Sequence, residues 1–486
     1  MPYPRSVTPT IQGMSSSSLL RWPLYSHVPL LRFRYRAFLS REQVDELVRP
    51  SSDTVELINA WLVHYGIRSS SISMTHRGNW LTITDVHVSQ ASQLLGASYQ
   101  LYRNVITNET VIRTVGYSLP AVLYTHVQTV TPTTYFSSMG VTLHTPHRRP
   151  FGPAPAQAPE SEKLGMVQAR QPPPEPAIVD PSDLRWLYGT IEYVPIAYNP
   201  GQNSLAVVGS EPPSLHDLTM FMDDYRRTTN GEQATFIMVN VGGGPLPLNG
   251  LPDETSNVAV QYASAMAYPT PLTFYRTLQT EEAFMDLIEL FLILPIVPRT
   301  ISISFNYFLE HDLPPPSARY ICNLFEQFGA RGSSILVASG NNGVGAAGNC
   351  RTFDVEFPSS CTCDVYHPFQ VLHHCEYKSL TRPCFAGPWV TSVGGTQSMR
   401  PEVATPHSGG GFSRLFRRPD YQDRDVLTYI QQLEGEYDGR YKYAPCHDLT
   451  FSYFIICAAL GAVATPTSPR KGWVVKSFWT AMTLPQ

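Results

Sequence analysis

Hydrophobic residues from about residue 179 onward follow two alternating spacings, which together predict an α/β fold. Short, continuous apolar runs are typical of buried strands, and four of them occur at 204–210, 234–243, 300–305 and 333–340. Between these runs, residues 257–268 and 317–332 repeat apolar positions at helical spacing. Strands that alternate with helices favour a mainly parallel sheet covered on both faces.

The helical spacing also predicts which side chains are buried. We expect the inner faces of the two helices to consist of Val258, Tyr262 and Ala265, and of Ile321, Phe325 and Phe328. In open α/β sheets, functional groups gather at the carboxyl ends of the strands. Asn341 and Asn342 follow the run at 333–340 and are predicted to lie at such an end.

Residues 39–138 form a first unit with a different pattern. Two helical segments precede an alternating stretch that is typical of paired strands, which predicts a small α+β domain. Asp53, with Thr54 as an alternative, is the expected N-cap of the second helix, and Gly66 is suited to its end. Residues 139–178 are rich in proline and predict an extended linker.

Composition excludes some classes of function. With a net charge of −4 and 15% charged residues, the chain lacks the basic character of a nucleic-acid-binding protein. Its eight cysteines lack zinc-finger spacing and indicate loop thiols or one or two disulfides, with the pairing left open. Residues 449–465 are apolar but short for a span of about 20 residues, so we expect no membrane anchor. No signal peptide is visible in the first 38 residues.

Several long motifs resemble one enzyme family. "VQYASAMAYPTPLTFY", "CNLFEQFGARGSSILVASGNNGVG", "PWVTSVGGTQ" and "SGGGFSRLFRRPDYQ" are similar to the sedolisins, which are serine-carboxyl peptidases of the fungal tripeptidyl-peptidase type. Residues 39–138 resemble the activation prodomain, and residues 179–443 resemble part of the peptidase domain. The resemblance implies a subtilisin-like fold, an extracellular zymogen active at acid pH, peptide or protein substrates, and association of the prodomain with the peptidase domain.

The general base of the family is a Glu, paired with an Asp four residues later, directly before a Val/Ile-Gln-Tyr motif. In this chain Thr255 occupies the Glu position and Ala259 the Asp position. Glu254 is a displaced candidate for the base, because one residue corresponds to a rotation of about 100° on a helix. The alternative role for Glu254 and Asp253 is that of acids favoured at a helix N-terminus.

The family places an Asp in the oxyanion hole, and Asn341 stands at that position. An Asp donates a hydrogen bond only when it is protonated, whereas an Asn amide donates at every pH. The alternative is a loop asparagine that favours the turn before Gly343.

The nucleophile motif Gly-Thr-Ser-x-Ser/Ala-x-Pro does not occur in the sequence. The nearest string places Gln397 where a nucleophile would stand, and Ser398 is interpreted as a surface or strand-end serine. No acidic calcium loop is visible either, so the sequence predicts no metal site and no cofactor, although the family binds calcium.

Three segments depart from the family pattern: an atypical N-terminal segment at 1–38, an insertion at 364–387 and an atypical tail at 444–486. We interpret the insertion at 364–387 as retained non-coding sequence, with a genuine surface insertion as the alternative, and we extend the first interpretation to the other two segments. The sequence therefore predicts a tripeptidyl-peptidase by lineage that is catalytically inactive. The alternative is a non-catalytic peptide-binding protein, or one whose prodomain inhibits or chaperones an active peptidase.

Overall fold

The computed structural model describes most of the residues between 38 and 341 and several shorter segments beyond them. The described residues are 18–23, 38–75, 77–104, 110–136, 179–193, 203–226, 234–241, 253–278, 280–304, 308–341, 355–361, 390–397, 402–404, 408–411, 413–416, 422, 424, 462–465 and 474–477.

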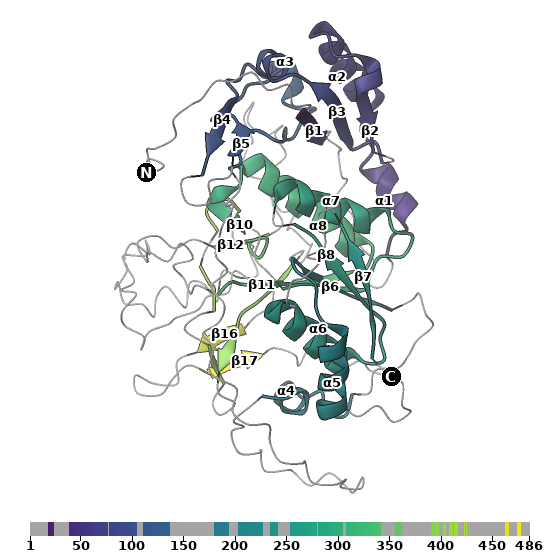
Figure 1. Ribbon diagram of the computed structural model, residues 1–486, viewed down its shortest axis with the longest axis vertical. Helices are drawn as coiled ribbons and strands as arrows, with labels where there is room; N and C mark the ends of the chain where they lie inside the picture. The colour runs from purple at the N-terminus through teal and green to yellow at the C-terminus, as the bar shows by residue number, and fades with distance from the viewer. Residues whose placement is uncertain are drawn as a thin grey trace, which may run out of the picture.

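A six-stranded sheet forms the centre of the larger part of the molecule (Figure 1). Its order is β13-β11-β9-β6-β8-β7, and every neighbouring pair is parallel. The strands are β6 (Leu205–Gly209), β7 (Phe236–Asn240), β8 (Leu272–Arg276), β9 (Thr300–Ile303), β11 (Ser334–Ala338) and β13 (Thr391–Val393). The predicted mainly parallel α/β fold is confirmed, and all four predicted strands are present.

Helices cover both faces of the sheet, as Figure 1 shows. Side chains alternate between the faces: Ala206 and Val208 join one hydrophobic cluster, while Leu205 and Val207 join another. The first cluster lies under α7 (Glu281–Ile293) and α8 (Pro315–Ala330). The second lies under α5 (Leu215–Tyr225) and α6 (Glu254–Ala267), with α4 (Pro181–Leu187) beside α6.

The predicted inner face is correct for α8, whereas for α6 only Ala265 of the three predicted residues is fully buried. Ile321, Phe325 and Phe328 are buried as expected. In α6 Val258 is 54% exposed and Tyr262 is only half-buried, whereas Ser256, Val260 and Ser264 face inward together with Ala265. The buried positions show that α6 is rotated about its axis relative to the prediction.

The 38–136 unit lies at one end of the molecule, directly beside α7 and α8 (Figure 1). Its helices are α1 (Arg41–Leu47), α2 (Ser52–His64) and α3 (Val88–Leu94), with short 3-10 turns at Ser69–Ser71 and Ala121–Leu123. Strands β2 (Ile72–Met74), β3 (Trp80–Val86) and β1 (Ser18–Pro23) form one antiparallel sheet, and β4 (Gln100–Arg103) pairs with β5 (Thr110–Arg113).

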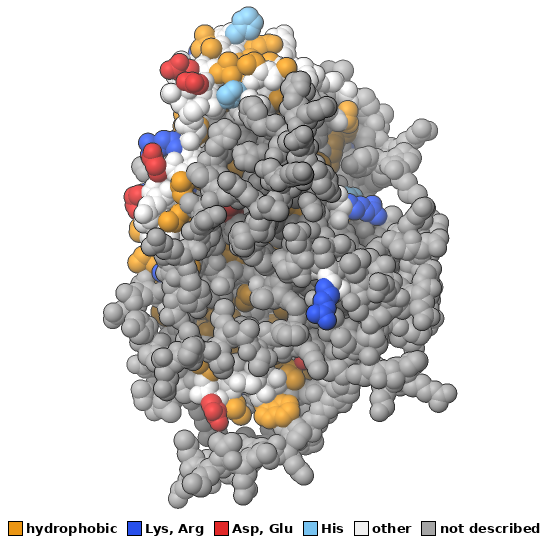
Figure 2. Space-filling view, turned by 180° about the vertical axis from the view of Figure 1, so that it is seen from behind, with side chains coloured by type: hydrophobic (Ala, Val, Ile, Leu, Met, Phe, Trp, Pro, Cys, Tyr) orange, Lys and Arg blue, Asp and Glu red, His pale blue; other side chains and the backbone are white. Residues whose placement is uncertain are grey.

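The ends of α2 combine one correct and one wrong prediction. Gly66 follows the helix with a φ of 75°, as expected of a residue at this position. The N-cap, however, is Ser51, whose hydroxyl accepts from the Thr54 N–H, and Asp53 lies in the first turn instead. Seen from the opposite side, Figure 2 shows hydrophobic side chains and histidines exposed at the end of the molecule that this unit forms.

A disulfide joins Cys322 in α8 to Cys361, just after β12 (Glu356–Phe357), which settles one pairing that the sequence left open. Strand β12 pairs with β10 (Phe308–Leu309), which runs into the 3-10 turn Glu310–Asp312. Two further small ladders are β14 (Thr396–Gln397) with β15 (Val403–Ala404), and β16 (Ala462–Thr465) with β17 (Val474–Ser477). Among the described residues, no helix has both the length and the apolar character needed to cross a bilayer.

Candidate functional site

Helix α6 carries the positions where the sequence predicts the catalytic carboxylates. Its N-cap is Asp253, whose carboxylate accepts the Ser256 N–H at 2.8 Å. The Asn257 N–H donates to the Asp253 carbonyl at 2.9 Å, so the helix is regular from its first turn. Glu254 is therefore the first residue of the helix, and its side chain is exposed. Because consecutive residues of an α-helix are rotated by about 100° about its axis, Glu254 and Thr255 point in different directions.

The position at which the sequence predicts the family's Asp carries a side chain that packs against the core. Ala259 is half-buried and packs against the hydrophobic cluster under α5 and α6, which includes Val260 and Phe274. Thr255 is exposed. Neither Thr255 nor Ala259 can take up a proton as a carboxylate does, so this helix offers Glu254 alone among the predicted base positions.

The start of α6 rests on the carboxyl end of strand β6. The Asp253 N–H donates to the Pro212 carbonyl at 3.3 Å. At the last residue of β6, a Cβ added to Gly209 would lie 2.9 Å from the Ser256 hydroxyl oxygen and 2.6 Å from the Phe274 ring. Position 209 therefore requires glycine, and the close approach holds the N-terminus of α6 at the functional edge of the sheet.

A buried arginine lies at the same edge and was not predicted from the sequence. Arg276, the last residue of β8, is 4% exposed; its guanidinium donates to Asn240 Oδ1 at 3.2 Å and lies 3.8 Å from the Glu211 carboxylate. These residues follow three adjacent strands, so the arginine ties the strand ends together. Its neighbours are distant in sequence, and no local pattern indicates the contact.

The strand β11 ends in the turn that carries Asn341. Gly340 has a φ of 113°, and a Cβ there would lie 2.6 Å from Cγ of Glu356. The turn is held from the other side by the Ser339 N–H, which donates to the Val393 carbonyl at 2.9 Å. Asn341 is exposed at the carboxyl end of the strand, where the sequence predicts it. Asn342 lies outside the described residues.

Residues 408–411, the Ser-Gly-Gly-Gly of the predicted motif, lie against this turn. The Gly409 N–H donates to the Gly340 carbonyl at 2.8 Å, and a Cβ on Gly409 would lie 1.9 Å from the Ser339 carbonyl oxygen. The Ser408 hydroxyl accepts the Gly395 N–H at 3.1 Å. The glycine is thus required for two backbone segments to touch directly beside Asn341.

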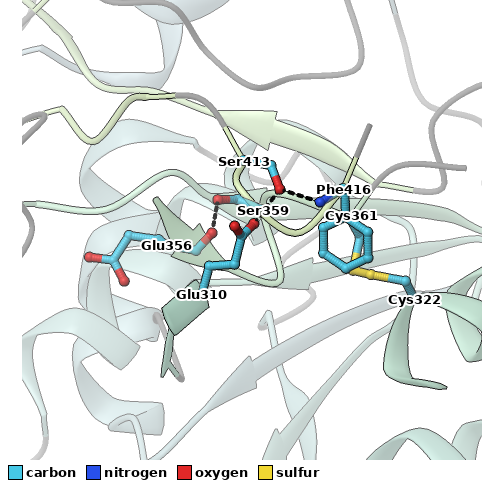
Figure 3. Close-up of a disulfide and its surroundings, with 7 residues drawn as sticks. All are labelled: Glu310, Cys322, Glu356, Ser359, Cys361, Ser413 and Phe416. Carbon is cyan, nitrogen blue, oxygen red and sulfur yellow. Dashed lines mark hydrogen bonds between the residues drawn. A yellow bond between two sulfur atoms is a disulfide. The ribbon is translucent and has the colours of Figure 1, made fainter. Parts of the chain in front are cut away.

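A buried carboxylate anchors the far end of this segment (Figure 3). Glu310 is 6% exposed and accepts from the Ser413 hydroxyl at 2.6 Å, the Arg414 N–H at 2.7 Å and the Leu415 N–H at 3.0 Å. The Ser413 oxygen in turn accepts the Phe416 N–H at 2.7 Å. Glu310 is a second residue that the sequence did not predict, because its contacts lie about a hundred residues further along the chain.

Ser413 is a buried-carboxylate partner that could be mistaken for a serine nucleophile, but its contacts show another role. Its hydroxyl proton is directed to Glu310, and its oxygen accepts backbone N–H groups from the turn that it begins. Ser413 therefore organises a turn, and its partner is not Glu254.

The remaining predicted positions lie outside the described residues. Ser398, the side chain of Gln397, the insertion at 364–387 and most of the tail at 444–486 belong to that group. In the part of the chain that the structure describes, no group of three or more His, Cys, Asp or Glu side chains is arranged to hold a metal ion.

Known proteins are similar to this chain both at its start and over most of its length. The family model of the Pro-kumamolisin activation domain matches residues 32–136. The tripeptidyl-peptidase SED2 of Arthroderma otae is 26% identical over 438 residues, which cover 84% of this chain and 66% of that protein. The probable tripeptidyl-peptidase SED4 of Trichophyton verrucosum is 28% identical over 442 residues, covering 84% of this chain and 64% of that protein.

One solved structure that is similar to this chain is that of a Pseudomonas sedolisin, a serine-carboxyl proteinase complexed with two molecules of pseudo-iodotyrostatin. It matches 51% of this chain and 66% of its own chain, at 19% identity and a TM-score of 0.34. The chain spans just under two thirds of the length of the curated relatives named above. With an activation-domain match at its start and fungal tripeptidyl-peptidases aligned over most of its length, the chain is similar to the sedolisins, the serine-carboxyl peptidases that its sequence motifs resemble.

Proposed function

We propose that this chain is a tripeptidyl-peptidase by lineage that binds peptides without cleaving them. The observation that carries the proposal is helix α6, where Thr255 and Ala259 stand at the two carboxylate positions and Ala259 packs into the core. A serine hydroxyl is a weak nucleophile unless an adjacent base takes its proton. Without that base, general-base assistance of about 10²–10⁴ in rate is lost, wherever the nucleophile comes from.

Glu254 does not restore the missing pair in this proposal. It is exposed at the first position of a regular helix, and the family's second carboxylate is replaced by a methyl group at Ala259. A base that works without its oriented partner loses much of its effect, because groups of a catalytic unit act together.

Asn341 supports retention of a binding role. Its amide is exposed on a turn held by Gly340, Glu356 and Gly409, so a donor is presented at the carboxyl edge of the sheet. An amide donates to a peptide carbonyl over the whole pH range, whereas the family's Asp depends on acid. We therefore propose that the contribution of the Asn341 amide to peptide affinity does not change between about pH 4 and pH 7.

We also propose an extracellular, acidic setting. Burial raises the pKa of Glu326 in α8 from 4.5 to about 7, so this carboxyl is neutral, and the fold is better stabilised, at acid pH. The names of the relatives supply the tripeptidyl-peptidase lineage.

The test is an activity assay after acid incubation, with a fluorogenic tripeptide substrate and a serine-directed fluorophosphonate probe. An active tripeptidyl-peptidase of the family serves as the positive control. We expect neither release nor labelling. Tripeptide release together with labelling of one serine would overturn the proposal.

Binding is tested separately, by fluorescence anisotropy with a labelled, unstructured peptide. The Asn341→Ala variant is expected to bind more weakly than the parent, and Asn104→Ala, in the 38–136 unit, serves as the control. Equal affinity of the Asn341→Ala variant and the parent would remove the binding role of the turn.

A further inference from the structure

Arg276 brings a buried positive charge to the carboxyl edge of the sheet. It is the last residue of β8, which lies between β6 and β7 (Figure 1), and its side chain is 5% exposed. Leu272 and Phe274 of the same strand belong to the cluster under α5 and α6. Because side chains alternate along a strand, Arg276 continues this face. Gly209, its partner in the ladder, is the residue whose added Cβ would meet Ser256 in the first turn of α6.

The counterion of this arginine is loosely held. Oε1 of Glu211 lies 3.8 Å from Nη2 of Arg276, whereas a charge-assisted hydrogen bond between such groups is about 2.7–2.9 Å long. The Glu211 side chain is 47% exposed, so its carboxylate can turn into solvent at little cost. The guanidinium is buried and donates to Asn240 Oδ1 at 3.2 Å. The positive charge is therefore fixed in place, while its partner Glu211 is exchangeable.

A ligand that displaced Glu211 would have to bring a carboxylate of its own. A buried charge is costly unless it is paired, so a neutral ligand group would leave the guanidinium uncompensated. A guanidinium is planar, and its N–H groups match the two oxygens of a carboxylate. Asn240 is exposed at the end of β7 and forms part of the rim around the arginine. The arrangement thus favours a carboxylate over an uncharged amide of the same shape.

Asp253 and Glu254 add negative charge to the same edge of the sheet. Asp253 is the N-cap of α6, where the partial positive charge of the helix N-terminus offsets its carboxylate. Glu254 is exposed, and solvent and salt screen its charge. The edge as a whole therefore does not attract anions over a distance. Recognition of a carboxylate depends on direct contact with the Arg276 guanidinium.

The strand register relates this arginine to the Asn341 turn. Strands β11, β9, β6 and β8 are consecutive in the sheet, and their pairings place Arg276 level with Ala338, just before the turn. Three strand spacings separate β8 from β11 by about 14 Å. An extended peptide advances about 3.3 Å per residue, so about four of its residues span that separation.

We propose that the carboxyl edge of the sheet binds peptide carboxylates, with Arg276 as the receiving cation and Glu211 as the counterion that the ligand displaces. The carboxylate comes from an Asp or Glu side chain of the peptide or from its C-terminus. It lies about four residues from the peptide carbonyl that Asn341 contacts. This inference rests on the proposed function and names the class of peptide that is bound.

The experiment compares three labelled peptides of one sequence by fluorescence anisotropy with the full chain. One has a Glu side chain and a C-terminal amide, one has Gln and a free C-terminal carboxylate, and one has Gln and a C-terminal amide. We expect at least one acidic peptide to bind about tenfold or more tightly than the neutral peptide, as a hydrogen-bonded charge pair provides. The acidic peptide that binds more tightly identifies the source of the carboxylate.

Three variants assign the preference to its residues. Arg276→Met is expected to abolish the difference between acidic and neutral peptides, and Arg276→Lys to retain part of it, because the charge remains without the planar fork. Glu211→Gln is expected to increase the preference about threefold or more, since it removes the competing carboxylate. Arg68→Met, at an exposed arginine of the 38–136 unit, is the control and should leave the preference unchanged.

The ratio of the affinities separates this site from a structural ion pair. Circular dichroism checks that Arg276→Met folds; if it does not, Glu211→Gln decides, because an ion pair that only stabilises the fold predicts no increase in the preference. Equal binding of all three peptides by the parent would refute the carboxylate site and leave the proposed peptide binding standing. If none of the peptides binds, the proposed function fails, and this site fails with it.

Discussion

The Ser413 hydroxyl donates a 2.6 Å hydrogen bond to the carboxylate of Glu310, 103 residues earlier in the chain. This bond connects the short β10–β12 ladder to the segment that lies beside Asn341. The carboxyl end of the sheet around Asn341 is thus built from segments that are far apart in sequence. Its geometry depends on a few buried polar groups. Four predictions follow from such contacts.

Replacing Glu310 by Gln is expected to lower the free energy of unfolding by about 2–3 kcal/mol, because the carboxylate accepts three hydrogen bonds away from solvent. Urea unfolding measures the loss. Glu192→Gln, at an exposed glutamate, is the control and should stay within about 0.5 kcal/mol of the parent. A neutral Glu310→Gln would mean that this carboxylate does not anchor residues 413–415.

Gly409→Ala is expected to destabilise the protein by about 3 kcal/mol or more, because the added Cβ would lie 1.9 Å from the Ser339 carbonyl oxygen. The backbone must shift to accept it, which also displaces the turn at Gly340. Thermal unfolding provides the measurement, and Gly116→Ala, where no atom lies within 4 Å of the added carbon, is the matched control. Equal melting temperatures for the two variants would contradict the close approach.

Glu326→Gln is expected to stabilise the protein at pH 8 and to have little effect at pH 4. The folded-state pKa of Glu326 is about 7 and the ordinary value is 4.5, so the folded protein holds the proton more tightly. Stability is therefore lost as pH rises from about 4.5 to 7, by about 1–3 kcal/mol in total. Urea unfolding at several pH values should show a flatter profile for the variant. A profile parallel to that of the parent would rule out Glu326 as the source.

Ala259→Asp is expected to cost about 1–3 kcal/mol, because the new carboxylate would enter a hydrophobic cluster. Val258→Asp, one residue earlier in the same helix and 54% exposed, should be nearly neutral. Urea unfolding of both variants makes the comparison. If the two substitutions cost the same, position 259 does not face the core, and the family's aspartate could be accommodated there.

The sheet could be predicted from the sequence because the strands β6, β7, β9 and β11 read as short apolar runs separated by helical spacing. The inner face of α6 could not, since Ser256 and Ser264 are polar residues that are nevertheless buried, while the apolar Val258 faces outward. Ser51 and Asp53 are both good N-cap residues, and the choice between them depends on where the chain turns.

The site was predictable only where a motif carries it. Asn341 follows a strand and was placed by that pattern, whereas Glu310 and Arg276 act through partners far along the chain. Helix α7 is likewise missing from the predicted elements, although it provides the face on which the 38–136 unit rests.

The Cys322–Cys361 bond has a practical consequence for the study of this protein. It encloses strand β11 and the Asn341 turn in one covalent loop, and such bonds form in oxidising surroundings. A bacterial cytosol would supply the chain with both thiols reduced. Recombinant material for the experiments above should therefore come from a periplasmic or secretory expression host.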